Sequence, residues 1–430
     1  MNYQEALAYL DSLNTFGIKL GLGRITRLLE LLDNPQNKYK TIHVTGTNGK
    51  GSTTAMLTAI LTNAKSKTGM YTSPHLVSYT ERMQINGMEI SEADFADSIA
   101  IVKEKVEIMV RDGEENPTQF EVITAAAFYY FARMQVEYAV IEVGLGGLLD
   151  STNVIIPEIA VITNVTFEHA NRCGGTLEGI AEHKAGIIKE GVPVVTAAQG
   201  IALDIIKEKA REKNSDVFVS GEDFSSVFKG FMKNKQQLTF SSAMVGVSST
   251  YNLGILGEHQ VENSSLAVMS ALILATNETR ITSEGMQKAL SEVHWAGRFE
   301  VMPQEDEQMI IIDGAHNKAG ATVLRQNLDK YFPNKEIVFL LGILEDKDVA
   351  GIVDELVRAE NSVVVTRPDS ERAAAPNKVA RQIKASYVET VEDIGEALAR
   401  AKALTMDNKI LCVAGSLYLI GVVRAMLVKN

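Results

Sequence analysis

Residues 41–52, which read TIHVTGTNGKGS, are of the types that bind nucleotide phosphates. A β-branched run enters a glycine-rich turn, and glycines let backbone N–H groups approach phosphate oxygens closely. A helix predicted after the turn would add the positive potential of its N-terminus. Lys50 can reach the β- and γ-phosphates, and the Ser52 hydroxyl can hold Mg²⁺.

This stretch departs from the strict G-x-x-x-x-G-K-[ST] motif in two places. Val44 stands where the motif has its first glycine, and Gly51 separates Lys50 from the hydroxyl of Ser52. The alternative is an ordinary glycine-rich β–α turn. Because strand, turn, lysine and hydroxyl follow in the right order, the sequence favours a phosphate site.

Three polar residues stand where a nucleotide site would need a metal ligand or a base. Glu142 ends an apolar run and precedes glycines; the carboxyl ends of parallel strands face the ligand crevice, so it is a candidate Mg²⁺ ligand, the alternative being a solvent-facing carboxylate. His169 follows a second apolar run and is either a ligand, a general base or a structural histidine. Lys184 stands among small and apolar residues on a predicted helix, where it is either functional or extends to the surface.

The second half of the chain has a similar strand end, in which an apolar run leads into Asp313-Gly314-Ala315-His316. Asp313 could accept a hydrogen bond from a ribose hydroxyl, and His316 could face a substrate; an Asp-Gly turn is the alternative. Arg298 could reach phosphates, or form a surface ion pair with Glu300.

Short apolar runs alternate with amphipathic helical segments along most of the chain. Continuous apolar runs are typical of parallel strands buried on both faces. Helices predicted between them, such as 53–63, 120–134 and 349–358, indicate a doubly wound α/β architecture. The predicted strands are 41–45, 139–143, 159–163, 192–196, 309–312, 337–341, 362–366 and 410–414.

The pattern changes between residues 217 and 256, where the shorter runs 217–220 and 237–241 predict a small β appendage before a helix at 261–275. The segment 294–300 precedes a new series of strands, so we expect a domain boundary there. The predicted fold is two doubly wound α/β domains. Residues 1–296 form a P-loop ATPase-type domain with the β appendage, and residues 297–430 form a smaller Rossmann-like domain.

The composition excludes several classes of protein. The 430 residues include 42 Lys and Arg against 54 Asp and Glu, a net charge of −12, which argues against nucleic-acid binding. Cys173 and Cys412 are the only cysteines, so a disulfide framework and a Cys-rich zinc module are excluded. No signal peptide is evident, and the most apolar stretch, 411–427, is too short and too polar to span a membrane. We expect a cytoplasmic protein that binds neither nucleic acid nor membranes.

Taken together, these segments resemble the folylpolyglutamate synthase and dihydrofolate synthase family of the Mur-ligase superfamily. The resemblance spans nearly the whole chain, and it is specific because many short motifs occur in the family's order and spacing. The matching motifs are TGTNGKGS at 45–52, TSPHL at 72–76, ER at 81–82, ING at 85–87, FE at 120–121, the stretch 142–153, KAGIIK at 184–189, HQ at 259–260 with Asn263, GR at 297–298, DGAHN at 313–317 and AGSLYL at 414–419.

The resemblance implies ATP-dependent amide ligation. A substrate carboxylate attacks the γ-phosphate of ATP to give an acyl phosphate and ADP, and the amine of L-glutamate then displaces phosphate. The acid substrate would be a reduced folate or dihydropteroate. The resemblance also implies a monomer, a P-loop domain of the central Mur-ligase type and a C-terminal glutamate-ligase domain.

The resemblance also assigns roles to residues, with catalytic roles on Lys50, His169, Lys184 and His316. The nucleotide-binding residues of the family map onto Asn48, Gly49, Lys50, Gly51, Ser52, Asn263, Arg298 and Asp313. Two Mg²⁺ sites map onto Ser52, Ser73, Glu142 and His169, and the family's carbamylated lysine maps onto Lys184. The pterin-binding surface maps onto Arg24, Thr118, Phe120, Glu121, Asp150 and Ser151, and the incoming glutamate would lie near His316 and Ser416.

The sequence departs from the family pattern at several of these motifs. The family has GLGGR where this chain reads GLGGL at 144–148, so Leu148 stands in place of an arginine. This change weakens or relocates binding of the substrate carboxylate. It has Asp where this chain has Glu168, Glu where this chain has His183, and Leu-Gly-x-Thr where this chain has Cys-Gly-Gly-Thr at 173–176; these changes tune the site rather than abolish it. Two alternatives stay open: a Mur-type ligase for another acid, and a P-loop protein that uses ATP as a switch.

Overall fold

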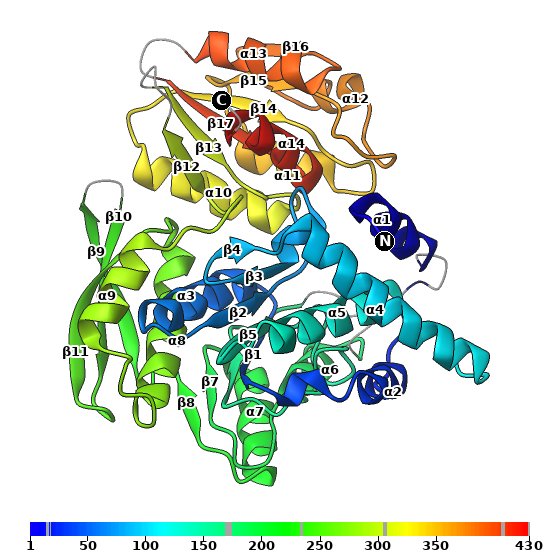
Figure 1. The fold of residues 1–430 in the computed structure, drawn as a ribbon. Coiled ribbons are helices and arrows are strands. Elements are labelled where there is room, and N and C mark those ends of the chain that lie inside the picture. Colours follow the sequence, from blue (N-terminus) through cyan, green and yellow to red (C-terminus); the bar gives the residue numbers. More distant parts are fainter. Residues whose placement is uncertain are drawn as a thin grey trace. The chain divides into compact units, whose positions relative to one another are not determined.

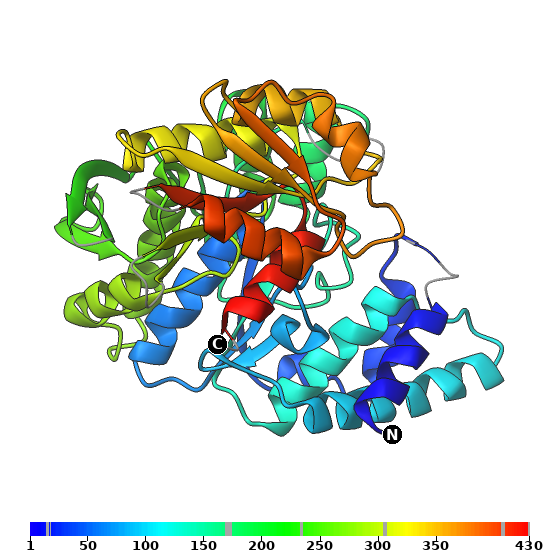
Figure 2. The ribbon, with the colours of Figure 1, turned by 90° about the horizontal axis from the view of Figure 1, so that it is seen from above.

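The computed structural model describes residues 1–430 except 14–16, 18, 168–173, 233–234, 304–307, 406–408 and 429–430. The chain forms two compact units. Unit 1 comprises Met1–Gly254 and His259–Val293, and unit 2 comprises Ile255–Glu258 and His294–Asn430. Each unit is built on a mainly parallel sheet with helices packed against it (Figure 1, Figure 2), which confirms the predicted α/β fold class. The functional boundary between residues 296 and 297 stays a prediction.

Unit 1 is built on an eight-stranded sheet. β3 and β4 pair antiparallel at one edge, and the other strands are parallel. The central strands are buried along nearly their whole length, in agreement with their continuous apolar runs. In spatial order the strands are β4 (Met88–Glu89), β3 (Met83–Ile85), β2 (Thr68–Tyr71), β5 (Tyr138–Glu142), β1 (Lys40–Thr45), β6 (Ile159–Ile162), β7 (Val194–Thr196) and β8 (Val217–Val219).

Helices cover both faces of this sheet, and α1 lies alongside α4 (Figure 2). A large apolar cluster joins α2, α4 and α5 to the sheet. Among the described helices, none combines the length and the apolar character needed to cross a bilayer. The helices described in this part of the chain are α1 (Tyr3–Ser12), α2 (Gly23–Leu31), α3 (Lys50–Asn63), α4 (Glu92–Arg111), α5 (Gln119–Arg133), α6 (Leu177–Ala185), α7 (Gly200–Glu212), α8 (Glu258–Ala275) and α9 (Ser283–Glu292).

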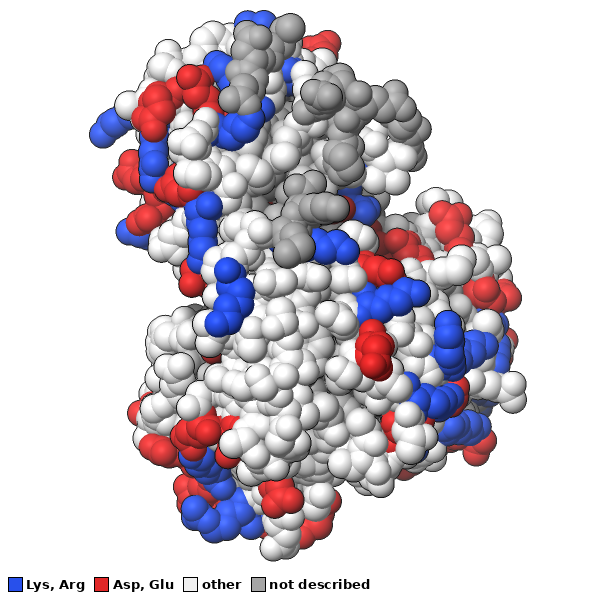
Figure 3. Space-filling model, turned by 90° about the vertical axis from the view of Figure 1, so that its left-hand side faces the viewer, with Lys and Arg blue, Asp and Glu red and all other residues white. Residues whose placement is uncertain are grey.

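A separate three-stranded antiparallel sheet is formed by β9 (Ser225–Met232), β10 (Lys235–Ser242) and β11 (Val247–Leu253). On its outer face the Thr239 and Thr250 hydroxyls lie 3.1 Å apart, and the exposed Val227 pairs with Thr239. Figure 3 shows the side of the molecule that faces left in Figure 1, where white, uncharged side chains cover the middle of the view. One expectation was wrong: the run at 217–220 belongs to β8, because it pairs in parallel with β7 and extends the main sheet.

Unit 2 contains a six-stranded sheet that is parallel except for the pairing of β12 with β13. Its apolar core lies between the sheet and the helices that pack on it. In spatial order the strands are β12 (Glu300–Pro303), β13 (Met309–Ile312), β17 (Ile410–Ala414), β14 (Ile337–Leu341), β15 (Ser362–Val365) and β16 (Tyr387–Thr390). The described helices are α10 (Lys318–Tyr331), α11 (Val349–Leu356), α12 (Pro376–Ala380), α13 (Ile394–Leu404) and α14 (Leu417–Val428).

Gly69 in β2 allows α5 to pack closely on the sheet. A Cβ atom at this position would lie 2.9 Å from the ring of Phe131. We expect Gly69→Ala to lower the free energy of unfolding by about 1–3 kcal/mol, because the core would be overpacked. Urea denaturation of the purified protein measures this effect.

Gly23→Ala is the matched control, since a Cβ atom there would meet nothing within 4 Å. In the Gly69→Ala background, Phe131→Leu should recover part of the loss by removing the ring. Equal unfolding midpoints for Gly69→Ala and the wild type would contradict this account of the packing.

Candidate active site

The glycine-rich turn lies between β1 and α3, and two of its glycines have no room for a side chain. Gly46 has φ +151°, and a Cβ atom there would lie 1.8 Å from Oγ1 of Thr163. Gly49 has φ +81°, and its Cβ atom would lie 2.2 Å from Oδ1 of Asn263. The turn therefore lies directly against the segment after β6 and against α8, which only glycine permits.

The segment after β6 holds the glycine-rich turn in place through hydrogen bonds to Thr47 and Asn48. Asn48 N–H donates to Oδ1 of Asn164 at 2.9 Å, while the Asn48 carbonyl accepts from the Thr163 hydroxyl at 2.6 Å. The Thr47 hydroxyl donates to the Thr166 carbonyl at 3.2 Å. Both sides of the turn are thus fixed, and α3 begins at Lys50 with its first N–H groups directed toward the turn.

Lys50 and Ser52 lie at the start of α3. The Lys50 ammonium donates to the carbonyls of Gly46 and Thr47, at 3.0 and 3.1 Å. The Ser52 hydroxyl accepts from Nε2 of Gln260 at 3.1 Å. The same Gln260 accepts from Asn263 Nδ2 at 2.9 Å. The first turns of α8 therefore bring Asn263 to the glycine-rich turn between β1 and α3, which we call the phosphate loop.

Glu142 and Ser73 meet at the carboxyl end of neighbouring strands. The Ser73 N–H donates to Oε2 of Glu142 at 3.1 Å, and the Glu142 side chain is buried. Together with the Ser52 hydroxyl, these are oxygen ligands, the type that Mg²⁺ prefers, so the residues fit the predicted metal. His169, the fourth predicted ligand, lies outside the described residues. Within the described ranges there is no group of three or more His, Cys, Asp or Glu side chains that could hold a metal ion.

Lys184 lies in the last turn of α6 and is buried, with 5% of its surface exposed. The loop after β5 approaches this helix closely, since a Cβ atom at Gly147 would lie 3.2 Å from the Lys184 Cα. Leu148 N–H donates to the His183 carbonyl at 2.7 Å. The loop that follows Glu142 is therefore fixed to the helix that carries Lys184.

Phe120 and Asp150 both lie close to Gly144, on the side where its Cβ atom would be. A Cβ atom at Gly144 would lie 2.5 Å from the Phe120 ring and 3.1 Å from Oδ2 of Asp150. Asp150 accepts hydrogen bonds from Leu145 N–H at 2.8 Å and from Thr152 N–H at 3.0 Å. Burial raises the pKa of Asp150, and these hydrogen bonds oppose the rise. The neighbouring Ser151, another predicted substrate residue, is also buried.

The two carboxylate oxygens of Glu121 differ in hydrogen bonding, since one accepts three hydrogen bonds and the other accepts none from the described residues. Its Oε2 accepts from Thr118 N–H at 2.7 Å, from the Thr118 hydroxyl at 2.8 Å and from Arg24 Nε at 3.1 Å. Its Oε1 is buried and has no hydrogen-bond partner among the described residues. A buried carboxylate oxygen without a donor is costly, and a bound ligand with an N–H group would satisfy it.

Unit 2 has its own group of predicted site residues, at the carboxyl ends of β13 and β17. Asp313 accepts from Phe299 N–H and from Ala315 N–H, both at 2.8 Å. Burial raises the pKa of Asp313, and the Arg298 guanidinium opposes that rise. Nδ1 of His316 lies 2.7 Å from the Gly314 carbonyl.

Ser416 lies next to this group. The Gly415 N–H before it donates to the Ala315 carbonyl at 2.9 Å, so the turns after β13 and β17 are joined. The Ser416 hydroxyl accepts from Leu419 N–H at 3.1 Å at the start of α14. Arg298, Asp313, His316 and Ser416 therefore share one edge of the unit 2 sheet.

In unit 1, two further residues position Ser52 and Ser73, although the sequence indicated no role for them. Gln260 orients Ser52 and Asn263, as described above. Glu81 accepts three backbone N–H groups, those of Leu76, Val77 and Ser78, at 2.6–2.7 Å, and so fixes the loop that follows Ser73. The S-x-x-E spacing of Ser78 and Glu81 is a capping-box signal that was available in the sequence. Gln260 belongs to the HQ motif at 259–260, which indicated the family but no role for this side chain.

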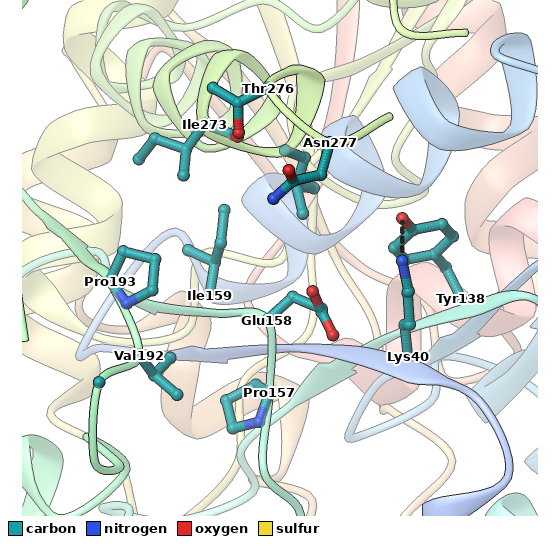
Figure 4. Close-up of a pocket in the computed structure, with 12 residues that line it drawn as sticks. Lys40, Tyr138, Pro157, Glu158, Ile159, Val192, Pro193, Ile273, Thr276 and Asn277 are labelled. Carbon is teal, nitrogen blue, oxygen red and sulfur yellow. Dashed lines mark hydrogen bonds between the residues drawn. The ribbon is translucent and has the colours of Figure 1, made fainter. Parts of the chain in front are cut away.

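The hollow shown in Figure 4 lies elsewhere in unit 1. It has a volume of about 310 Å³, and its walls include Lys40, Tyr138 and Ile159, the first residues of β1, β5 and β6. The Lys40 ammonium lies 3.4 Å from the Tyr138 hydroxyl. The phosphate loop follows the opposite end of β1, so this hollow is at the other edge of the sheet and is separate from the candidate active site.

Comparison with known proteins agrees with this geometry. Residues 44–271 match the Mur ligase middle domain, and residues 297–417 match the Mur ligase, glutamate ligase domain. A dihydrofolate synthase/folylpolyglutamate synthase of Bacillus subtilis is 33% identical over 98% of both chains.

Two solved structures are similar over nearly the full length. The folylpolyglutamate synthase of Thermotoga maritima has a TM-score of 0.88 and 35% identity, over 99% of this chain and 96% of that chain. A folylpolyglutamate synthase complex with AMPPCP and folate has a TM-score of 0.81 and 32% identity, over 99% of this chain and 100% of that chain.

The phosphate loop, the carboxylates at the strand ends and the matches to both Mur ligase domains identify an ATP-dependent ligase of the Mur type. Within that class the resemblance seen in the motifs is confirmed. The chain belongs to the folylpolyglutamate synthase/dihydrofolate synthase family, whose members are ATP-dependent ligases that add glutamate to folates.

Gly49→Ala should abolish measurable ATP binding, because the new methyl group would collide with Asn263 in the phosphate loop. The same substitution at Gly113 is the matched control. Gly113 has φ +83°, close to that of Gly49, but a Cβ atom there would meet nothing within 4 Å. Titration calorimetry with Mg-ATP compares the two variants, and loss of binding in both would show that backbone strain rather than the collision is responsible.

Proposed function

We propose that this chain uses ATP to join L-glutamate to a reduced folate, and that it also accepts dihydropteroate. The carboxylate oxygen of the acid attacks the γ-phosphorus, and the bond between that phosphorus and the β,γ-bridging oxygen breaks to release ADP. The glutamate amine then attacks the acyl carbon, loses a proton and expels phosphate. The observation that carries the proposal is the buried, unpartnered Oε1 of Glu121 beside Phe120, in a chain that also has the phosphate loop.

The phosphate loop supplies the electrostatic stabilisation. The N–H groups of Asn48 to Ser52 and the Lys50 ammonium would surround the triphosphate. To reach it, the ammonium would exchange the carbonyls of Gly46 and Thr47 for phosphate oxygens. Because the transferred group carries charge on its oxygens in the transition state, this cation contributes mainly to the rate.

Mg²⁺ ions would be held at two sites by the oxygens of Ser52, Ser73 and Glu142, with His169 as a further ligand. When bound, Mg²⁺ neutralises phosphate charge and orients the transferring group. Glu81 and Gln260 hold these ligands in place. Glu81 fixes the loop after Ser73, and Gln260 donates a hydrogen bond to the Ser52 hydroxyl.

The acid substrate would lie between Phe120, Glu121 and Asp150. A pterin ring has an apolar face and several N–H donors along its edge. The ring of Phe120 offers the face a partner, and Oε1 of Glu121 and the Asp150 carboxylate can accept from the edge. Arg24, Thr118 and Ser151 complete this surface.

Unit 2 would bind the incoming glutamate and part of the nucleotide. Arg298 and Asp313 would complete the nucleotide site. Because the Gly314 carbonyl can only accept, the hydrogen of a neutral His316 lies on Nδ1, which leaves Nε2 to accept the proton of the attacking amine. Ser416, at the same sheet edge, would contact the glutamate. The residues proposed for the nucleotide thus come from both units.

We further propose that the protein is a cytoplasmic monomer whose partners are these small molecules. The need for ATP and the buried free thiol of Cys412 support a reducing compartment.

Purified protein should release phosphate only when Mg-ATP, glutamate and a reduced folate are all present. Lys50→Ala should lower turnover by about 10²-fold or more, because a positioned charge is lost in the transition state. A coupled phosphate assay measures both, and Lys288→Ala, an exposed lysine on α9, is the control.

The acid substrate is identified by the same assay with reduced folate and dihydropteroate compared side by side, and by mass spectrometry of the product. Phosphate release that does not depend on either pterin would refute the folate assignment and favour a different acid. Release without any acid or amine would indicate an ATP switch.

Lys184 should carry a carbamate. Burial and a nearby divalent cation both disfavour an ammonium, and the neutral amine can capture CO₂, giving up one proton to form an anionic group that offers Mg²⁺ an oxygen ligand. Protein equilibrated with ¹³C-labelled bicarbonate should show a carbamate carbon signal that Lys184→Ala lacks. Short carboxylates such as acetate should partly restore turnover to Lys184→Ala, and a bare Lys184 amine in well-ordered density would disprove the modification.

A further inference from the structure

β1 is a buried central strand in which three polar residues alternate with two apolar ones. Ile42 and Val44 point to one face of the sheet, and Thr41, His43 and Thr45 point to the other. The Thr45 hydroxyl donates to the Gly146 carbonyl at 2.6 Å, and Nε2 of His43 lies 2.9 Å from the Thr152 hydroxyl. The polar face of β1 therefore contacts the connection between β5 and β6, which contains Asp150.

The contact of His43 continues to the Asp150 carboxylate. The Thr152 hydroxyl lies 2.5 Å from Oδ1 of Asp150, and an ionised carboxylate can only accept. Thr152 therefore donates to Asp150, which leaves its oxygen to accept from Nε2–H of His43. The hydrogen bonds are therefore all donated in one direction, from His43 to Thr152 and from Thr152 to Asp150.

Packing alone does not explain a histidine at this position. His43 is completely buried, and burial with the nearby Lys189 ammonium lowers its pKa to about 3, so the ring is neutral. Its Nδ1 has no hydrogen-bond partner among the described residues. A buried acceptor without a donor destabilises the fold, so an apolar residue of similar size would pack at lower cost.

We propose that His43 is a positioning residue for the acid substrate, acting through Thr152 to fix the Asp150 carboxylate. The inference rests on the proposed function, in which Asp150 accepts a hydrogen bond from the substrate. By holding the Thr152 hydroxyl in one direction, His43 keeps Oδ1 of Asp150 occupied. The rest of the carboxylate then stays in place beside Gly144 and Phe120 for the ligand.

Direct measurement of folate binding separates an effect on the position of Asp150 from an effect on the stability of the fold. His43→Leu should weaken folate binding, measured by calorimetry without ATP, by about 5- to 20-fold, since a charge-assisted hydrogen bond loses its alignment. Mg-ATP affinity should change by less than about twofold. The urea midpoint at neutral pH should change little, because the unpartnered Nδ1 is removed while the Thr152 oxygen loses its donor.

Two other substitutions at His43 test the geometry of the donor. His43→Gln places an amide N–H near the position of Nε2 and should restore folate affinity to within about threefold of the wild type. His43→Asn places the amide near Nδ1 and should bind folate as weakly as His43→Leu, although it is equally polar.

Thr152 provides an independent arm. Thr152→Val should weaken folate binding as His43→Leu does, whereas Thr152→Ser should not. The double variant His43→Leu/Thr152→Val should bind folate no more weakly than Thr152→Val alone, because both substitutions act on the same series of hydrogen bonds. Normal folate affinity in His43→Leu, additive losses in the double variant, or parallel losses of ATP binding and stability would overturn the proposal. Failure of wild-type protein to bind any folate would instead overturn the proposed function.

Discussion

The whole candidate active site depends on one steric constraint: three chain segments come together at the amino end of α3 with no space between them. The turn after β1 lies against Thr163 on one side and Asn263 on the other, at distances that exclude even a methyl group at Gly46 and Gly49. This closeness is what brings the backbone of Asn48 within reach of Asn164 and the Ser52 hydroxyl within reach of Gln260. The loop therefore has its shape before any nucleotide arrives, so that its N–H groups do not have to be ordered when phosphate binds.

The same strand that carries the phosphate loop also positions the substrate side of the site. Val44 and Ile42 fill the core on one face of β1, and the residues between them hold the connection that follows β5. Movement of β1 would thus displace the phosphate loop and Asp150 together. Because the strand pairs with β5 and β6 on both sides and is buried, such movement is strongly opposed. Rigid placement of two binding surfaces by one element suits a reaction in which the acid and the γ-phosphate must meet in line.

The sequence predicted the elements that are apolar throughout and the residues at their carboxyl ends. β1, β5 and β13 were recognised because burial on both faces leaves a continuous apolar run, and Glu142 and Asp313 followed from the rule that such strands end at the ligand crevice. β16 was missed because it is only partly buried and so has no such run, and β8 was assigned to the appendage because a short edge strand resembles a hairpin strand. The pairing of Gln260 with Ser52 spans 208 residues, and that of His43 with Thr152 spans 109. Contacts of this kind depend on how distant segments pack, which no local pattern contains.

The start of α8 has a consequence for how the chain can vary. Connections between compact units usually accept insertions and deletions, because few contacts constrain them. Here the connection Ile255–Glu258 enters α8 directly, and Gln260 in its first turn already touches Ser52. One residue inserted between Gln260 and Asn263 would rotate these two side chains by about 100° relative to each other, so that only one of them could face the phosphate loop. The spacing of these two residues is therefore as tightly constrained as the glycines of the loop itself.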